Sequence, residues 1–313
     1  MTIKKKDKIF VAGHTGLVGS AIVRELKRKG YKKIITRSRK QLNLLNQNKV
    51  FNFLKKTKPD FIFIAAAKVG GINYNNTSRA EFIYENLMIE ANIIHGSYVN
   101  NINKLILLGS SCVYPRDCKQ PIKEEYLLTG KLEKTNEPYA VSKIAGIKLC
   151  ESYNRQYKTQ YKCLMPTNTF GPFDTFNEKT SHFIPALILK IFKAKKNNRK
   201  SISIWGNGKV KREVLYVDDL AKACVYFMNK KFEGNIINIG SSIEHTIKDY
   251  TKKICNFMSY NGKIIFDTNK PSGTPRKKLD VRKAKKLGWH SETRFLEGLK
   301  KTYESFKKGQ IRN

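Results

Sequence analysis

A glycine-rich segment between an apolar strand and a helix constrains the fold of this chain more than any other feature. Residues 8–12 have the composition of a short buried strand, and residues 20–29 show helical periodicity. Gly13, Gly16 and Gly19 lie between them with the spacing GxxGxxG. Glycines in such a turn let the backbone N–H groups at the start of a helix approach a pyrophosphate. The sequence therefore predicts a dinucleotide-binding βαβ unit near residue 10.

Strand-like and helical segments alternate through the first half of the chain. This alternation predicts βαβ units and a parallel sheet with right-handed crossovers, which is an α/β fold with a Rossmann-type, doubly wound sheet. A later strand-like run is expected to rejoin the same sheet. The strand-like runs are residues 33–36, 61–64, 104–108, 161–165 and 235–240, and the helical runs are residues 83–100 and 139–157.

The pattern changes after Pro166, where residues 166–172 are rich in turn-forming residues. We therefore expect a second, smaller domain of mixed α/β structure towards the C-terminus. Residues 1–168 plus 213–242 are assigned to the dinucleotide-binding domain. Residues 169–212 plus 243–313 are assigned to a discontinuous substrate-binding domain.

Tyr139 and Lys143 carry the clearest chemical signal. Their spacing puts a phenol and an ammonium on one helix face, where the cation favours phenolate and lets the phenol exchange protons. Ser110 and Ser111 follow an apolar strand, and a hydroxyl there can polarise a carbonyl. This set suits hydride transfer. A cysteine is usually a buried packing residue, but the place of Cys112 beside the serines favours a second reaction.

Arg37 and Arg39 follow the second predicted strand, where proteins that prefer NAD place an acidic residue for the ribose diol. Arginine suits a 2′-phosphate instead. The sequence therefore favours NADPH over NADH, with surface arginines as the alternative.

The net charge is +36, so nucleic acid must be considered as a partner. The lysines are spread along the chain and no nucleic-acid-binding signature occurs, so we do not expect such a partner. The six cysteines show no metal-ligand spacing, which predicts free thiols and no metal. No apolar run reaches the ~18 residues that a membrane span needs, and no secretory segment is found, so a cytoplasmic location is expected.

Several long motifs are spread along the chain: AAAKVGGINYNN at 65–76, GSSCVYP at 109–115, NEPYAVSKIAGIKLCESYNR at 136–155, MPTN at 165–168, SHFIPA at 181–186 and GTPRK at 273–277. Together they resemble the extended short-chain dehydrogenase/reductase family over nearly the whole chain. Within it, the chain is similar to the enzymes that convert GDP-4-keto-6-deoxy-D-mannose into GDP-L-fucose. The resemblance implies 3,5-epimerisation and NADPH-dependent reduction of the 4-ketone in one site, and a homodimer.

The resemblance also implies roles for individual residues. The catalytic candidates are Ser110, Cys112, Tyr139, Lys143 and His182. The NADPH-binding candidates are Gly13, His14, Thr15, Gly16, Leu17, Val18, Gly19, Arg39, Ser110, Ser111, Lys143, Pro166, Thr167, Asn168, Thr169 and His182. The GDP-sugar candidates are Lys190, Trp205, Arg212 and Asp280. Thr15 departs from the family, in which this position is often basic, and this weakens the preference for NADPH.

Cys112 and His182 are the expected acid–base pair for epimerisation, with Cys112 as the base and His182 as the acid. Which of them serves C3 and which serves C5 stays open. Another nucleotide-sugar epimerase, dehydratase or 4-reductase is the first alternative. A non-catalytic protein that senses dinucleotides or binds polyanions is the second.

Overall fold

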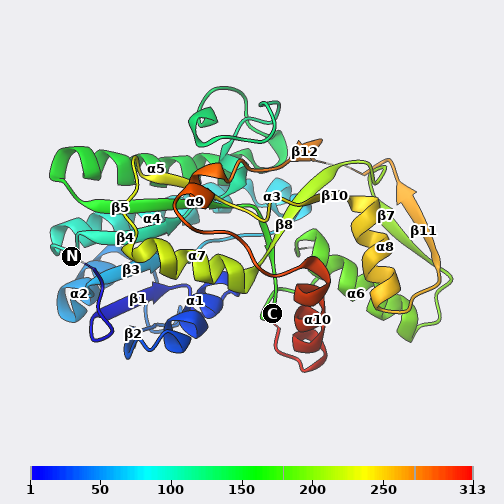
Figure 1. The fold of residues 1–313 in the computed structure, drawn as a ribbon, viewed down its shortest axis with the longest axis horizontal. Helices are drawn as coiled ribbons and strands as arrows, with labels where there is room; N and C mark the ends of the chain where they lie inside the picture. Colours follow the sequence, from blue (N-terminus) through cyan, green and yellow to red (C-terminus); the bar gives the residue numbers. More distant parts are fainter. Residues whose placement is uncertain (1, 179, 271–272, 312–313) are drawn as a thin grey trace.

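A six-stranded parallel sheet is the centre of the computed structural model, which describes residues 2–178, 180–270 and 273–311 (Figure 1). The strand order is β2-β1-β3-β4-β5-β9, and every neighbouring pair is parallel. This confirms the predicted Rossmann-type sheet. The strands are β1 (Lys8–Ala12), β2 (Lys33–Ile35), β3 (Phe61–Ile64), β4 (Lys104–Leu108), β5 (Gln160–Pro166) and β9 (Ile236–Ile239).

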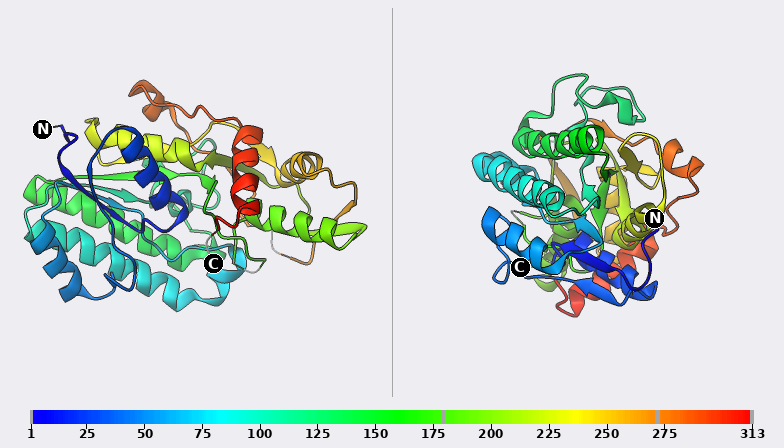
Figure 2. Two further views of the ribbon diagram at one scale, coloured as in Figure 1. Left: turned by 90° about the horizontal axis from the view of Figure 1, so that it is seen from below. Right: turned by 90° about the vertical axis from the view of Figure 1, so that its left-hand side faces the viewer.

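Helices cover both faces of this sheet, as the two views of Figure 2 show. Successive strand side chains point to opposite faces, so Val11 lies in one core and Phe10 in the other. The core that contains Val11 also takes side chains from α1 (Leu17–Arg28) and α7 (Val217–Asn229). The other core takes them from α2 (Gln47–Thr57), α4 (Arg79–Val99) and α5 (Glu137–Tyr157).

A second group of strands lies beyond the carboxyl ends of the parallel sheet, on the right of Figure 1. Its centre is β8 (Lys211–Tyr216), which pairs with three short strands. A separate parallel pair lies at the far end. The three strands are β6 (Asn168–Phe170), β10 (Glu244–Thr246) and β12 (Arg276–Lys277), and the pair is β7 (Ser201–Trp205) with β11 (Lys263–Asp267).

Three helices pack on these strands around a third apolar core: α6 (Phe183–Lys196), α8 (Ile247–Phe257) and α10 (Phe295–Lys307). Short helical segments complete the described structure. They are α3 (Ile72–Thr77), α9 (Arg282–Lys286) and the 3₁₀ turns η1 (Ser111–Val113), η2 (Glu124–Tyr126) and η3 (Lys134–Asn136).

Buried carboxylates join the two groups of strands. Glu213 on β8 accepts backbone hydrogen bonds from Ser242 (2.6 Å) and Leu279 (2.8 Å). Asp219 on α7 accepts hydrogen bonds from the backbone of Glu292 and Thr293, just before α10. Within the described residues, none of the helices combines the length and apolar character that a membrane span requires.

Candidate active site

The predicted cofactor-binding segments meet at one edge of the parallel sheet. The glycine-rich loop follows β1, Ser110 and Ser111 follow β4, and residues 166–169 begin at the end of β5. Open α/β sheets bind ligands at the carboxyl ends of their strands, where the strand order changes direction. Here that point lies between β1 and β3.

The glycine-rich loop needs its glycines. Gly13 has a φ of +86°, and a Cβ there would lie 2.6 Å from the backbone N of Ala66 after β3. A Cβ at Gly19 would collide with the carbonyl oxygen of Gly13. The loop therefore brings the N-terminus of α1 against the residues after β3, with no side chain between them. This cradle fits a pyrophosphate bound by backbone N–H groups.

His14 and Thr15 lie within the same loop and differ in environment. Thr15 is exposed, whereas His14 is half-buried, and burial lowers the pKa of His14. Among the described residues, His14 Nδ1 is buried without a hydrogen-bond partner.

Arg37 and Arg39 both lie exposed at the end of β2. The Arg37 guanidinium lies 5.5 Å from the centre of the Phe53 ring and donates a hydrogen bond to the carbonyl of Thr36. Arg39 lies 3.8 Å from Glu85 on α4. Two cations at this edge fit the extra phosphate of NADPH.

Lys143 is almost fully buried, with 2% of its side chain exposed. Its Nζ donates a hydrogen bond to the carbonyl of Leu108 at the end of β4 (2.9 Å) and lies 2.7 Å from Glu90 Oε1 on α4. Burial opposes the charged form, but Glu90 and Tyr139 outweigh it and raise the pKa of Lys143. Burial also raises the pKa of Glu90 to about 7, and Lys143 opposes that rise.

Tyr139 lies one helical turn from Lys143, with its ring centre 5.9 Å from Nζ. Burial raises the pKa of Tyr139, while Lys143 and a hydrogen bond with Ser110 lower it only in part. The net direction is opposite to the sequence-based expectation, because that expectation counted the cation and not the burial of the phenol. Tyr139 is thus held as the protonated phenol, which suits a proton donor.

The Cys112 sulfur has two donors that the sequence did not predict. Asn136 Nδ2 lies 3.2 Å and Lys277 Nζ 3.4 Å from Sγ. The Cys112 backbone N–H also donates to the Ser110 hydroxyl. An ammonium and an amide N–H therefore face this sulfur from two different segments of the chain. Lys277 comes from β12, so both groups of strands contribute to this site.

His182 is the residue before α6, and its side chain is exposed. Desolvation by the surrounding protein, and then the positive charge of Lys277, lower the pKa of His182. The segment before it packs on the loop after β3, where the Gly71 N–H donates to the carbonyl of Thr180 (2.8 Å). Because Lys277 faces both Cys112 and His182, the structure brings the two acid–base candidates into one site.

Three GDP-sugar candidates lie in the second group of strands and helices. Arg212 on β8 is buried, burial lowers its pKa to about 10, and it faces Cys112. Trp205 on β7 is 41% exposed. Lys190 on α6 donates to the carbonyl of Ser203, and burial lowers its pKa. The buried Asp280 differs, because both of its carboxylate oxygens accept from Arg282.

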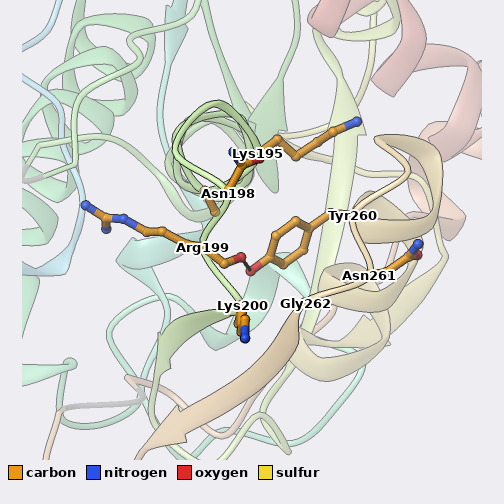
Figure 3. A pocket seen from close by; sticks show the side chains of 8 residues that line it. Lys195, Asn198, Arg199, Lys200, Tyr260, Asn261 and Gly262 are labelled. Atoms are coloured by element: carbon orange, nitrogen blue, oxygen red, sulfur yellow. Dashed lines mark hydrogen bonds between the residues drawn. The ribbon is translucent and has the colours of Figure 1, made fainter.

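Two surface hollows lie away from these residues. One, of about 410 Å³, lies beyond the end of α6, where Tyr260 donates to the carbonyl of Arg199 (Figure 3). The other, of about 640 Å³, is lined by residues after β9 and around Trp289. Neither is lined by a predicted site residue. Within the described ranges no cluster of three His, Cys, Asp or Glu could hold a metal ion, and all six cysteines are free thiols.

Comparison with known proteins gives matches over the whole chain. Residues 9–240 match the model of the NAD dependent epimerase/dehydratase family. The GDP-L-fucose synthase of Escherichia coli K12 is 47% identical, over 98% of each chain. A GDP-6-OMe-4-keto-L-xylo-heptose reductase from C. jejuni has a TM-score of 0.93 at 34% identity, over 99% of this chain and 100% of that one. A GDP-L-fucose synthetase from Naegleria fowleri bound to NADP has a TM-score of 0.90 at 28% identity, over 99% and 96%.

Proposed function

The chain belongs to the NAD dependent epimerase/dehydratase family, and we propose that it converts GDP-4-keto-6-deoxy-D-mannose to GDP-L-fucose with NADPH as the reductant. The relative that is 47% identical and carries the name GDP-L-fucose synthase supports this choice. One observation carries it: the Cys112 sulfur, with Asn136 and Lys277 as donors, beside the reductase pair Tyr139 and Lys143. A simple ketone reductase needs the pair but not the thiolate.

The proposed NADPH site consists of the glycine-rich loop, Arg39, Ser110, Ser111, Lys143, His182 and residues 166–169. NADPH supplies the hydride for C4 of the sugar. Lys143 keeps one ammonium N–H beyond those directed at Glu90 and Leu108, and we assign it to the nicotinamide ribose.

Epimerisation uses the acidity of the C3 and C5 protons, which lie next to the ketone. In our proposal the Cys112 thiolate removes a proton and becomes a thiol, while His182 donates its proton to the opposite face of the ring. Proton exchange with solvent then returns both residues to their starting states before the second carbon reacts. The enolate that forms carries its charge on the C4 oxygen. Ser110 and Tyr139 hydrogen-bond that oxygen and stabilise the charge.

Reduction uses the same oxygen. As hydride reaches C4, Tyr139 donates its phenolic proton to the developing alkoxide. The raised pKa of Tyr139 keeps that proton in place until it is needed, and Lys143 then stabilises the phenolate that remains.

We assign the GDP-sugar to Lys190, Trp205, Arg212 and Asp280, with the buried Arg212 as the partner of the pyrophosphate. We also propose the domain division 1–168 plus 213–242 and 169–212 plus 243–313. The protein would act as an isomerase and an oxidoreductase in the cytoplasm. A homodimer would form through α4 and α5, where Tyr84, Val99, Val141 and Tyr157 are exposed.

The test is to incubate the protein with GDP-4-keto-6-deoxy-D-mannose and NADPH, follow the absorbance loss, and identify the sugar by NMR. Cys112→Ser is run alongside. Wild type should give GDP-L-fucose. The variant should lose C3 and C5 exchange with D₂O by about 10²–10⁴-fold, the usual contribution of a general base.

A D-configured 6-deoxy sugar from wild type would instead support a plain 4-reductase, the activity named for the heptose reductase from C. jejuni. In that case Cys112 would have no role in epimerisation. Absence of any turnover would point to a different keto sugar or to a non-catalytic protein.

A further inference from the structure

Glu90 forms a fully buried ion pair with the proposed catalytic lysine, and no role has been assigned to it above. Glu90 is 1% exposed and Lys143 2% exposed, and the two charged groups lie 2.7 Å apart. Moving two charges out of water costs several kcal/mol for each ion, and apolar replacements of such pairs are often as stable or more stable. Stability alone therefore does not account for a carboxylate at this position.

The fold makes room for this carboxylate. Gly146 lies on α5 one turn after Lys143, and a Cβ at Gly146 would collide with Glu90 Oε2. A glycine inside a helix is less favourable than an alanine. Here it lets α5 pack against α4 closely enough for Glu90 to reach the ammonium.

Glu90 and Leu108 together fix the ammonium from two elements, since Leu108 ends β4 and Glu90 comes from α4. These contacts fix the position of the ammonium relative to the carboxyl end of the parallel sheet, which the glycine-rich loop also follows, and not only relative to α5. Tyr139 depends on this placement, because its phenolate form is stabilised by the Lys143 charge.

We propose that Glu90 is a positioning residue for the reduction, which holds Lys143 in its charged form and in place behind Tyr139. The proposal rests on the function proposed above, because Glu90 acts through Tyr139 and Lys143. Glu90 itself is not expected to touch the sugar.

The other titratable groups around the pair are Tyr139 and Cys150 on α5 and Cys163 on β5, and Cys112 faces Tyr139. Among the carboxylates of the described residues, Glu90 is the one within ion-pair distance of this ammonium. Removing the Glu90 charge should therefore leave the buried ammonium without a counter-charge and lower the pKa of Lys143.

Glu90→Gln is the test variant, because glutamine keeps the shape of the side chain and removes its charge. Loss of a buried counter-charge should move the alkaline limb of the reduction rate down by at least about two pH units. Near pH 6, well below the shifted limb, Lys143 is protonated in wild type and variant alike, so the two should agree within about threefold. At about pH 9.5, one unit above the shifted limb, the variant should be about tenfold slower.

Two variants serve as controls. Glu25→Gln removes another buried carboxylate, which pairs with Arg28 on α1 away from the site, and should leave the alkaline limb in place. Glu90→Asp keeps the charge, so it should keep the wild-type limb even if its rate is lower. A uniform loss of rate at every pH in Glu90→Gln would overturn the proposal, because that is the result of a purely structural role.

A second readout needs no sugar and separates this proposal from the proposed function. NADPH affinity, measured by fluorescence titration, should weaken above about pH 8 in Glu90→Gln and not in wild type, because Lys143 loses its proton. If wild type and Glu90→Gln have the same pH profile of NADPH affinity and the same pH profile of rate, the positioning role is refuted. Failure of wild type to reduce the sugar, with the affinity difference intact, would refute only the function.

If Glu90→Gln does not fold, the double variant Glu90→Gln/Lys143→Met shows whether the unpaired Lys143 charge is the cause. This double variant removes both charges, so it should recover thermal stability. Failure of the double variant to fold would show that Glu90 supports the helix pair independently of Lys143, contrary to the proposal.

Discussion

At the scale of single residues, the two donors to the Cys112 sulfur allow the two proposed reactions of the site to be separated. Asn136 reaches it from η3 and Lys277 from β12, each within hydrogen-bond distance. Both donate to the sulfur of the proposed base, and neither is needed to deliver a proton to the C4 oxygen. Their removal should therefore slow epimerisation more than reduction.

Asn136→Ala and Lys277→Met test this separation. Each should slow C3 and C5 exchange with D₂O by about 10- to 100-fold, since a hydrogen bond to a charged group contributes roughly 1.5–3 kcal/mol. Loss of NADPH absorbance should change much less. Lys209→Met, an exposed lysine before β8, is the matched control. Equal losses of exchange and reduction would contradict the assignment.

Sequence reasoning proposed site residues that lie close to one another along the chain. It missed residues that reach the site from distant segments. Tyr139 and Lys143 share a helix turn, and the serines and Cys112 share a strand end, so their spacing revealed them. Asn136 and Lys277 contact Cys112 across 24 and 165 residues. Glu90 was missed because nothing in the sequence shows which residue of α4 faces Lys143.

At the scale of elements, the close contact between the glycine-rich loop and the residues after β3 permits a direct test. Gly13→Ala would place a Cβ 2.6 Å from the Ala66 backbone N at a φ of +86°. The loop must then shift, so NADPH affinity should fall at least about tenfold, and left-handed strain should lower stability by about 1–2 kcal/mol. Fluorescence titration and thermal unfolding measure the two effects.

Gly30→Ala separates strain from displacement. Gly30 has a similar φ of +81°, but a Cβ there would meet no atom within 4 Å. This variant should lose a comparable amount of stability and bind NADPH as wild type does. An unchanged affinity in Gly13→Ala would show that the loop does not hold the cofactor.

Strong periodicity predicted the elements of the parallel sheet well, and weaker patterns were missed. The run at 104–108 became β4, and the helix predicted over 139–157 is α5, which begins two residues earlier at Glu137. The helix predicted over 83–100 begins at Arg79. The strands β6, β10 and β12 have two or three residues each, too few for an alternating pattern, and their pairing with β8 supplies the order.

At the scale of the whole molecule, Glu213 on β8 links the two groups of strands. It accepts hydrogen bonds from Ser242, after β9 of the parallel sheet, and from Leu279, after β12 of the second group. Burial raises the pKa of Glu213 to about 7, against the hydrogen bonds from Leu279 and Ser242 that lower it. The folded state thus binds a proton that the unfolded state, with a pKa near 4.5, has released. The stability from this proton is complete below about pH 4.5 and is lost as the pH rises through about 7.

Glu213→Gln should reduce that pH dependence. Wild type should lose up to about 3 kcal/mol of unfolding free energy between about pH 5 and pH 8 through this carboxyl, and the variant should not. The variant should also be less stable overall by about 1–3 kcal/mol, because glutamine can accept only one of the two backbone hydrogen bonds. Urea unfolding at both pH values measures this, and identical slopes would disprove it.

The chain enters the second group of strands at β6, returns through α7 to β9, and then leaves again for β10 and the residues beyond. A single exchange of gene segments between two relatives, anywhere from β6 to β12, would therefore build at least one sheet from mismatched parents. Transfer of the whole second group of strands from one relative to another would need more than one exchange. Point substitutions, by contrast, alter individual contacts and leave every sheet with strands from one parent.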